Sequence, residues 1–360
     1  MTSTYDVTRV GGGEVFMSSS GMNRLAKADA VVFDCDGTLI DVSKSYDATI
    51  IKTTASVTRS LFGKTSRIPE VGAEIILKIR LTGGFNSDWD IAYALSLFSA
   101  VALDGQAPKG SPGGGEDSTE RLKLIVSNFA SKERLTGWRS VDQYLLRSRF
   151  ESERVREMRK YLGYPGNPLT SRLAATFDQI YYGASLYRRV YGVAPQVGYK
   201  RGLIDRERVI VLERSLNALS EMVGAKRMAM ATGRPLVAVE HTLGRLLDYF
   251  ERDASVYIGD GDIFPELAPK LSKFKKPSGE SLVLARRKFS SKVLLYVGDS
   301  AEDRLMVRNA GGPDGSILFA GIYGNSLDSK EQASYFKGTD SDLIVEDVNQ
   351  LPGLLEMARN

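Results

Sequence analysis

The chain has 360 residues, of which 42% are hydrophobic and 26% charged, a composition typical of a globular protein with one large domain or two ordinary ones. Its formal net charge of +4 is too small to indicate nucleic-acid binding, and no apolar run approaches the about 18 residues that a membrane span needs. The single cysteine, Cys35, excludes an internal disulfide, and no signal-peptide pattern is present, so we expect a cytoplasmic protein.

The chain begins with a polar segment, and the first predicted strand follows it. Residues 1–27 contain the runs 11–13 (GGG) and 18–20 (SSS), and we expect an N-terminal extension that is at least partly mobile. The apolar run Val31, Val32 and Phe33 follows and predicts a buried strand. This strand ends in the acidic sequence DCDGT.

A helical insertion is predicted for residues 43–202, where strand signals nearly vanish. Apolar residues recur there at helical spacing, in the stretches 43–62, 69–80, 88–102, 119–130, 140–162 and 171–191. The Gly- and Pro-rich stretch 104–118 predicts an exposed loop, and its sequence leaves open whether the loop acts as a lid.

Strand and helix patterns alternate after the insertion. Strands are predicted at 227–231, 256–259, 292–297, 316–322 and 342–346, with helices at 206–223, 235–250, 278–289 and 301–310. This alternation predicts an α/β fold with a doubly wound, mostly parallel sheet. We therefore expect a core domain of residues 28–42 and 203–360 and an inserted helical domain of residues 43–202.

Polar residues follow four of the predicted strands, where open α/β sheets place their ligand sites. In chain order they are Asp34 and Asp36; Thr232, Gly233 and Arg234; Lys275 and Lys276; and Asp299 and Asp303.

These residue types suit phosphoryl transfer. Carboxylates at positions 34 and 299 can converge on one Mg²⁺, which offsets the repulsion between a carboxylate nucleophile and a phosphate dianion. Asp34 can then attack phosphorus, while Asp36 protonates the leaving alcohol and later deprotonates water. Thr232, the backbone N–H groups that follow it at Gly233 and Arg234, and a lysine supply donors to the phosphoryl oxygens.

The four motifs DCDGT, ATGRP, KKP and GDSAED resemble, in order and character, those of the haloacid dehalogenase superfamily. The resemblance covers about residues 23–40 and 205–350, implies a Rossmann-like core, and makes the insertion a large helical C1 cap after the first strand. It implies that Asp34 is the nucleophile and Asp36 the acid/base, with the Asp36 carbonyl and Asp299 also on Mg²⁺. It further implies that Thr232 and Lys276 bind phosphate, with Lys276 preferred over Lys275 because the family lysine precedes proline, and that Asp303 is an outer or direct partner of the metal.

A second sequence in the insertion, GGFNSDWD, is similar, together with FDQIYYG at 177–183, to a little-characterised branch of the superfamily's first subfamily. Asn86, Asp88 and Trp89 lie in it. The sequence suits a specificity element that faces a cleft, and it equally suits a helix N-cap with Phe85 and Trp89 packed in the cap core.

The predicted function is that of a Mg²⁺-dependent phosphatase that acts on a small phosphorylated metabolite, either a sugar phosphate or a phosphorylated organic acid. A phosphomutase of the same superfamily is the alternative within enzymes, and a non-catalytic binding or regulatory module is the alternative of another class. Dehalogenation is disfavoured because that chemistry does not need Asp36. The sequence predicts no nucleic-acid or membrane partner and does not distinguish a monomer from a homodimer.

Overall fold

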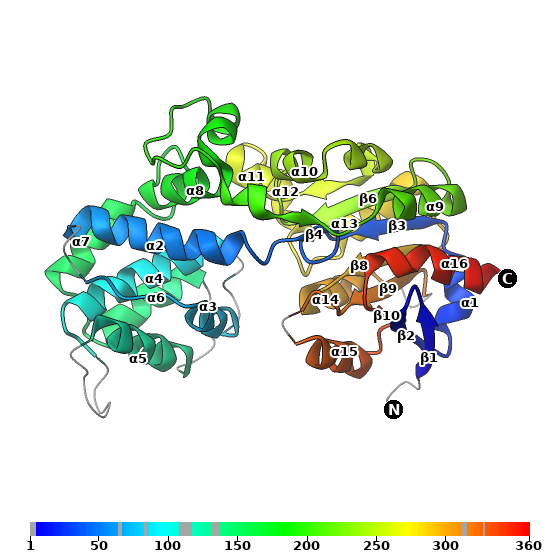
Figure 1. Cartoon of the computed structure of the whole chain (residues 1–360), viewed down its shortest axis with the longest axis horizontal. Helices are drawn as coiled ribbons and strands as arrows, with labels where there is room; N and C mark the ends of the chain where they lie inside the picture. The colour runs from blue at the N-terminus through cyan, green and yellow to red at the C-terminus, as the bar shows by residue number, and fades with distance from the viewer. Residues whose placement is uncertain are drawn as a thin grey trace. The chain divides into compact units, whose positions relative to one another are not determined.

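The computed structural model describes residues 5–63, 67–82, 85, 87–107, 117–131, 137–311, 315–326 and 328–360. By its internal contacts the chain divides into two compact units. Unit 1 comprises Met1–Val42 and Glu207–Asn360, and unit 2 comprises Ser43–Arg206. Figure 1 shows both units and labels many of their helices and strands.

The described residues of unit 1 form an eight-stranded sheet in the order β1-β2-β10-β9-β8-β3-β6-β7. Neighbouring strands from β10 to β7 are parallel, and β1 and β2 are antiparallel additions at one edge. The doubly wound, mostly parallel sheet predicted from the sequence is thus confirmed. The strands are β1 (Tyr5–Val10), β2 (Gly13–Ser18), β3 (Ala30–Phe33), β6 (Met228–Thr232), β7 (Val256–Tyr257), β8 (Leu294–Gly298), β9 (Ile317–Ile322) and β10 (Leu343–Val345).

The N-terminal segment contains regular structure that the sequence did not predict. Residues from Tyr5 onward form β1, β2 and the helix α1 (Gly21–Leu25), and β2 pairs with β10. Val15 and Met17 of β2 are buried in the apolar core, which explains why these residues are held at the sheet edge. The glycine run provides the turn between the two strands.

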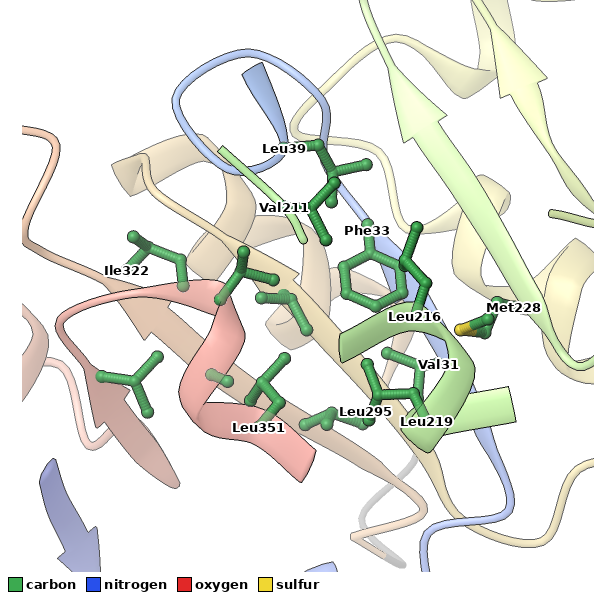
Figure 2. Packing of buried hydrophobic residues seen from close by; sticks show 14 of the residues in the cluster. Val31, Phe33, Leu39, Val211, Leu216, Leu219, Met228, Leu295, Ile322 and Leu351 are labelled. Carbon is green, nitrogen blue, oxygen red and sulfur yellow. The ribbon is translucent and has the colours of Figure 1, made fainter. Parts of the chain in front are cut away.

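Helices cover both faces of the sheet, and each face receives alternate residues of β3. Val31 and Phe33 pack in one core cluster with residues of α9 (Glu213–Val223), α10 (Leu236–Leu243), α16 (Leu351–Arg359) and α1. Figure 2 shows Leu216, Leu219 and Leu351 lying over Val31, Phe33 and Leu295. Ala30 and Val32 pack on the other side with α13 (Glu280–Phe289), α14 (Ala301–Ala310) and α15 (Ser329–Gly338). Burial of each large apolar side chain contributes about 1.5–3 kcal/mol, so this double layer holds the strand ends firmly.

Two linker strands mark where unit 1 is interrupted. β4 (Ile40–Asp41) and β5 (Arg208–Val209) pair antiparallel, with Ile40 opposite Val209. The predicted helix over 206–223 is therefore wrong in its first part: β5 occupies 208–209, and α9 begins at Glu213. The remaining short elements of unit 1 are α11 (Asp260–Ile263) and α12 (Ala268–Leu271), with 3₁₀ turns at Gly244–Tyr249, Arg252–Ala254, Ser272–Phe274 and Val348–Gln350.

All the regular elements among the described residues of unit 2 are helices, and the unit ends in a 3₁₀ turn at Leu203–Arg206. Its helix α4 is the central one, since every residue from Ile91 to Ala102 is buried. The helices are α2 (Tyr46–Phe62), α3 (Ala73–Arg80), α4 (Asp88–Leu103), α5 (Ser118–Ser131), α6 (Gly137–Arg147), α7 (Glu153–Leu162) and α8 (Arg172–Tyr191).

Two details of unit 2 differ from the predicted pattern. The stretch 140–162 is two helices rather than one, because Ser152 caps α7 by accepting a hydrogen bond from the backbone N–H of Val155. Helix α8 is broken at Gly183, whose φ of 72° places it outside the helical region. In the predicted loop 104–118, residues 108–116 lie outside the described residues. Within the part of the chain that the structure describes, no helix combines the length and apolar character that crossing a membrane requires.

Candidate active site

The candidate site lies where β3 and β8 end side by side. Val31 is opposite Leu295 and Phe33 opposite Val297, so Asp34 and Asp299 leave the sheet from neighbouring strands. The backbone N–H of Asp34 donates to the carbonyl of Val297 at 2.8 Å, which continues the pairing to the strand end. In the sheet, β6 and β7 lie on one side of β3, and β8, β9 and β10 lie on the other. This is the switch point of the sheet, the position at which open α/β folds bind their ligands.

A tight loop after β3 holds the next residues close to Asp299. The carbonyl of Cys35 accepts hydrogen bonds from the N–H groups of Leu39 and Ile40 at 2.8 and 3.0 Å. Gly37 has a φ of 75°, and a Cβ built on it would lie 1.9 Å from Oδ2 of Asp299. Only glycine fits this loop, because any side chain would displace the Asp299 carboxylate.

Two amide side chains fix the backbone of the site from the β9 side. Asn325 donates from Nδ2 to the carbonyl of Gly37 at 2.8 Å, and Gln332, on α15, donates from Nε2 to the carbonyl of Asp299 at 2.6 Å. Sequence reasoning missed both residues. They follow β9, a strand that carries none of the four motifs, so no local signal marked them.

Lys276 joins two of the carboxylates. Its Nζ lies 2.6 Å from Oδ1 of Asp34 and 2.6 Å from Oδ1 of Asp303, and its side chain is 14% exposed. Although burial opposes its charge, the carboxylates of Asp303 and Asp34 raise the pKa of Lys276 well above its ordinary value. The lysine therefore stays charged in the site.

Asp303 anchors this lysine and the start of α14. Its Oδ1 accepts from Lys276 and from the hydroxyl of Tyr296 at 2.7 Å, and its Oδ2 accepts from the backbone N–H and the hydroxyl of Ser300 at 3.0 and 2.6 Å. Burial works against the charge of Asp303, but Lys276 and these hydrogen bonds hold its pKa below the ordinary value. Each oxygen already accepts two bonds, which suits an anchoring carboxylate beside a metal ligand better than a direct ligand. Tyr296 was not predicted, because it reads as an ordinary strand residue. Ser300 lies in the predicted motif GDSAED, but no role was assigned to it.

Asp34 and Asp299 carry the opposite perturbation. Burial raises the pKa of Asp34 to about 7 against the opposing effect of Lys276, and the neighbouring Asp303 and Asp36 raise it further. Burial and the charges of Asp34 and Asp303 likewise raise the pKa of Asp299 well above its usual range. The described part of the site thus holds more negative charge than its lysine offsets.

A divalent cation fits this deficit of positive charge. Asp34, Asp299 and Asp303 each offer a carboxylate oxygen, and these oxygens lie within 4.8 Å of one another. Hard oxygen donors of this kind are the ligands that Mg²⁺ prefers. Since the oxygens of Asp303 are already hydrogen-bonded, Asp34 and Asp299 are the carboxylates suited to direct contact with the ion.

The second predicted motif ends β6 beside this cluster. Thr232 is buried, and its Oγ1 accepts a hydrogen bond from the backbone N–H of Arg234 at 3.1 Å. A Cβ built on Gly233 would meet no atom within 4 Å, so packing does not require glycine there. Arg234 was predicted to belong to the phosphate-binding set; the structure buries its side chain between Asp36, at 3.0 Å, and Glu207, at 2.5 Å. Glu207 was missed because its charge-rich surroundings read as a helix face.

The predicted residues of the insertion make contacts within unit 2. Asp88 accepts from Arg80 at 3.0 Å, and Arg80 also pairs with Asp47 at 2.6 Å. Trp89 donates from Nε1 to Oδ1 of Asp178 at 3.2 Å. Ser87 occupies the N-cap position of α4, but its side chain makes no capping hydrogen bond. Asn86 lies outside the described residues.

Comparison with known proteins finds a matching family model and similar solved structures. The model of the haloacid dehalogenase-like hydrolases matches residues 28–311. Among solved structures, a Northeast Structural Genomics Consortium target is 17% identical with a TM-score of 0.62, and the match covers 91% of this chain and 98% of that one. Phosphatase Tt82 from Thermococcus thioreducens is 23% identical with a TM-score of 0.52, and covers 86% of this chain and 99% of its own. At these identities the two structures show a shared fold.

The search of curated proteins found no match. The family match spans most of the chain, including all four predicted motifs, and the resemblance inferred from those motifs is confirmed. The chain belongs to the haloacid dehalogenase-like hydrolases.

Proposed function

We propose that this hydrolase is a Mg²⁺-dependent phosphatase that cleaves a small phosphorylated metabolite, a sugar phosphate or a phosphorylated organic acid, through an aspartyl-phosphate. The observation that carries the proposal is the pair Asp34 and Asp299 at adjacent strand ends, with Lys276 on Asp34 and an unbalanced negative charge. A phosphate monoester and a divalent cation complete such a site electrostatically.

Asp34 is the nucleophile in this proposal. One of its carboxylate oxygens forms a bond to phosphorus, and the bond from phosphorus to the leaving oxygen breaks. Asp36 gives its proton to that leaving oxygen, and the alcohol departs. A water oxygen then attacks phosphorus, Asp36 takes a proton from the water, and inorganic phosphate leaves as the Asp34 carboxylate is restored.

The surrounding residues bind and balance charge. The carboxylates of Asp34 and Asp299, with the main-chain carbonyl of Asp36, would hold Mg²⁺, and Asp303 would support them from its hydrogen-bonded position. The ion supplies positive charge that offsets the repulsion between nucleophile and phosphate. Lys276 and Thr232 would donate to phosphoryl oxygens, together with backbone N–H groups at Gly233.

The test is release of inorganic phosphate from a panel of sugar phosphates and phosphorylated organic acids. We expect the wild type to release phosphate with Mg²⁺, and Asp34→Asn to reduce kcat by at least about a thousandfold because the nucleophile is gone. The matched control is Asp253→Asn, which changes an aspartate that is 81% exposed and should retain full activity.

Three results would contradict parts of the proposal. A wild type that never exceeds Asp34→Asn on any substrate removes the hydrolase assignment. Phosphate moved between carbons without release indicates a phosphomutase instead. Full activity after exhaustive treatment with EDTA contradicts the metal role of Asp34 and Asp299.

A further inference from the structure

A chain of buried ion pairs leads away from Asp36. Arg234 lies at its centre, with a side chain that is 0% exposed. Its Nη1 lies 3.0 Å from Oδ1 of Asp36, and its Nη2 lies 2.5 Å from Oε2 of Glu207. The Glu207 side chain is also 0% exposed, and its Oε2 accepts a further hydrogen bond from the hydroxyl of Thr242 at 2.9 Å. Asp36 is the member that reaches solvent, with 30% of its side chain exposed.

Fold stability alone gives little reason for this arrangement. Burying charged groups removes them from water, and a buried ion pair often contributes no more stability than apolar side chains of similar size. A pair of that kind does supply orientation, because the guanidinium is a rigid planar fork whose direction is set by the groups that bind it. Glu207 and Asp36 bind different nitrogens of the same fork, so Glu207 fixes the side from which Arg234 meets Asp36.

Glu207 also has a distinctive place in the chain. It is the first residue of unit 1 after the insertion and directly precedes β5. β5 pairs with β4, and β4 follows the loop that carries Asp36 and Gly37. The backbone bridge between Asp36 and Ile40 ties that loop to β4. Glu207 and Asp36 are therefore connected twice, through the backbone of the paired linkers and through Arg234.

We propose that Glu207 is a positioning residue for the acid/base Asp36, acting through Arg234 to hold the Asp36 carboxyl in the direction of the leaving oxygen. The inference rests on the proposed phosphatase function. Proton donation demands a defined direction and distance, so a small loss of alignment at Asp36 slows that step. Attack by Asp34 does not involve Glu207, and it should proceed as before.

Leaving-group dependence isolates this role. p-Nitrophenolate is a stable anion and departs without a proton. Phenolate depends more strongly on proton donation, and an alkoxide depends on it most strongly. We expect Glu207→Gln to lower kcat/KM, which reports formation of the aspartyl-phosphate and not its hydrolysis, less than about threefold for p-nitrophenyl phosphate. The same variant should lower kcat/KM about 10–100-fold for the best alkyl ester of the panel, with phenyl phosphate between them. Glutamine keeps the size and one acceptor oxygen of glutamate but removes the charge that orients Arg234.

Two further variants complete the experiment. Thr242→Val removes the hydroxyl that supports Glu207 and should give a smaller loss with the same order of substrates. The matched control is Glu213→Gln, since Glu213 forms an exposed pair with Arg245 at 2.6 Å and should leave all three rates unchanged.

The outcomes are distinguishable. Equal loss of kcat/KM on all three substrates, or no loss on any, overturns the positioning role. If Glu207→Gln does not fold, Thr242→Val decides, because a flat response across the substrates likewise overturns it. A wild type that releases no phosphate from any ester refutes the proposed phosphatase function instead, and that result is known before any variant is compared.

Discussion

Replacing the proposed nucleophile should stabilise the metal-free protein. The Asp34 side chain is only 9% exposed and lies among Asp36, Asp299 and Asp303, and its pKa is raised from an ordinary 3.8 to about 7. A carboxyl whose pKa is raised by folding contributes stability below its unfolded-state value, and that contribution is lost as pH rises through the folded-state value. The wild type should therefore lose stability between about pH 4 and pH 7. Asparagine does not ionise, so Asp34→Asn should retain the free energy of unfolding that the wild type loses over this pH range.

The magnitude follows from the two pKa values. A difference of about 3 in pKa corresponds to about 4 kcal/mol, because each pKa unit is worth about 1.4 kcal/mol. Near pH 8 we expect Asp34→Asn to exceed the wild type by up to about 4 kcal/mol in free energy of unfolding. Near pH 5 the folded wild type holds its proton and only the unfolded chain ionises, which reduces the expected gain to about 2 kcal/mol. Asp34→Asn also removes the charge repulsion between Asp34 and Asp299, which adds to the gain in stability.

Urea unfolding in EDTA at the two pH values provides the assay. Both tryptophans, Trp89 and Trp138, belong to unit 2, so their fluorescence follows that unit. Far-UV circular dichroism follows both units, and a transition seen by dichroism without a change in fluorescence belongs to unit 1. The wild type and Asp34→Asn should differ in that transition.

Asp29→Asn is the matched control, and its effect on stability should have the opposite sign. Although burial opposes the charge of Asp29, hydrogen bonds from Ser291 and from the N–H groups of Lys292 and Val293 lower its pKa. Such a carboxylate contributes stability above its unfolded-state pKa, and that stability is lost as pH falls. Asp29→Asn should therefore weaken unit 1 near pH 8. A raised pKa of Asp34 is refuted if Asp34→Asn destabilises the protein near pH 8, or if its effect is the same at both pH values.

Three other substitutions give sharp expectations. Gly37→Ala should abolish phosphate release and lower Tm, because its Cβ would lie 1.9 Å from Oδ2 of Asp299; wild-type turnover would contradict a role for this close approach in holding Asp299. Asn325→Ala removes the 2.8 Å hydrogen bond to the Gly37 carbonyl and should cut kcat by about tenfold with little change in Tm, whereas an unchanged kcat would exclude a role for this bond. Trp89→Phe breaks the bond to Asp178 and should cost unit 2 about 1 kcal/mol in urea unfolding; a changed order of preferred substrates at unchanged stability would instead favour a specificity role.

The parallel strands of unit 1 could be predicted from the sequence because they are buried on both faces. Such strands read as short apolar runs, and β3, β6, β8, β9 and β10 all do. β1 and β2 were missed for a physical reason. Edge strands are half exposed and carry polar residues such as Asp6, Thr8 and Arg9, and β2 pairs with β10, which lies more than 300 residues along the chain. No local pattern records that pairing.

The site, too, contains residues that the sequence predicts and residues that it does not. Asp34 and Asp299 end predicted strands, so the fold rule for open sheets placed them together. The partners of Arg234 could not be predicted, because Glu207 reaches it from the linker through tertiary structure alone. Tyr296 illustrates a further limit: its ring is ordinary strand content, while its hydroxyl is a hydrogen-bond donor that only the folded geometry directs at Asp303. Sequence patterns thus reveal which strand ends carry chemistry, but not which side chains orient it.

The pairing of β4 with β5 bears on how such a protein can evolve. Antiparallel partners such as Ile40 and Val209 have Cα atoms only about 5 Å apart, a gap that a short hairpin turn spans. The chain therefore leaves unit 1 and returns to it at almost the same point. An exchange of gene segments at this point can replace all of residues 43–206 without altering the order of strands in the sheet. The catalytic scaffold and the inserted helices can diversify separately, and the smallest ancestor of this architecture needs no more than a hairpin where the insertion now stands.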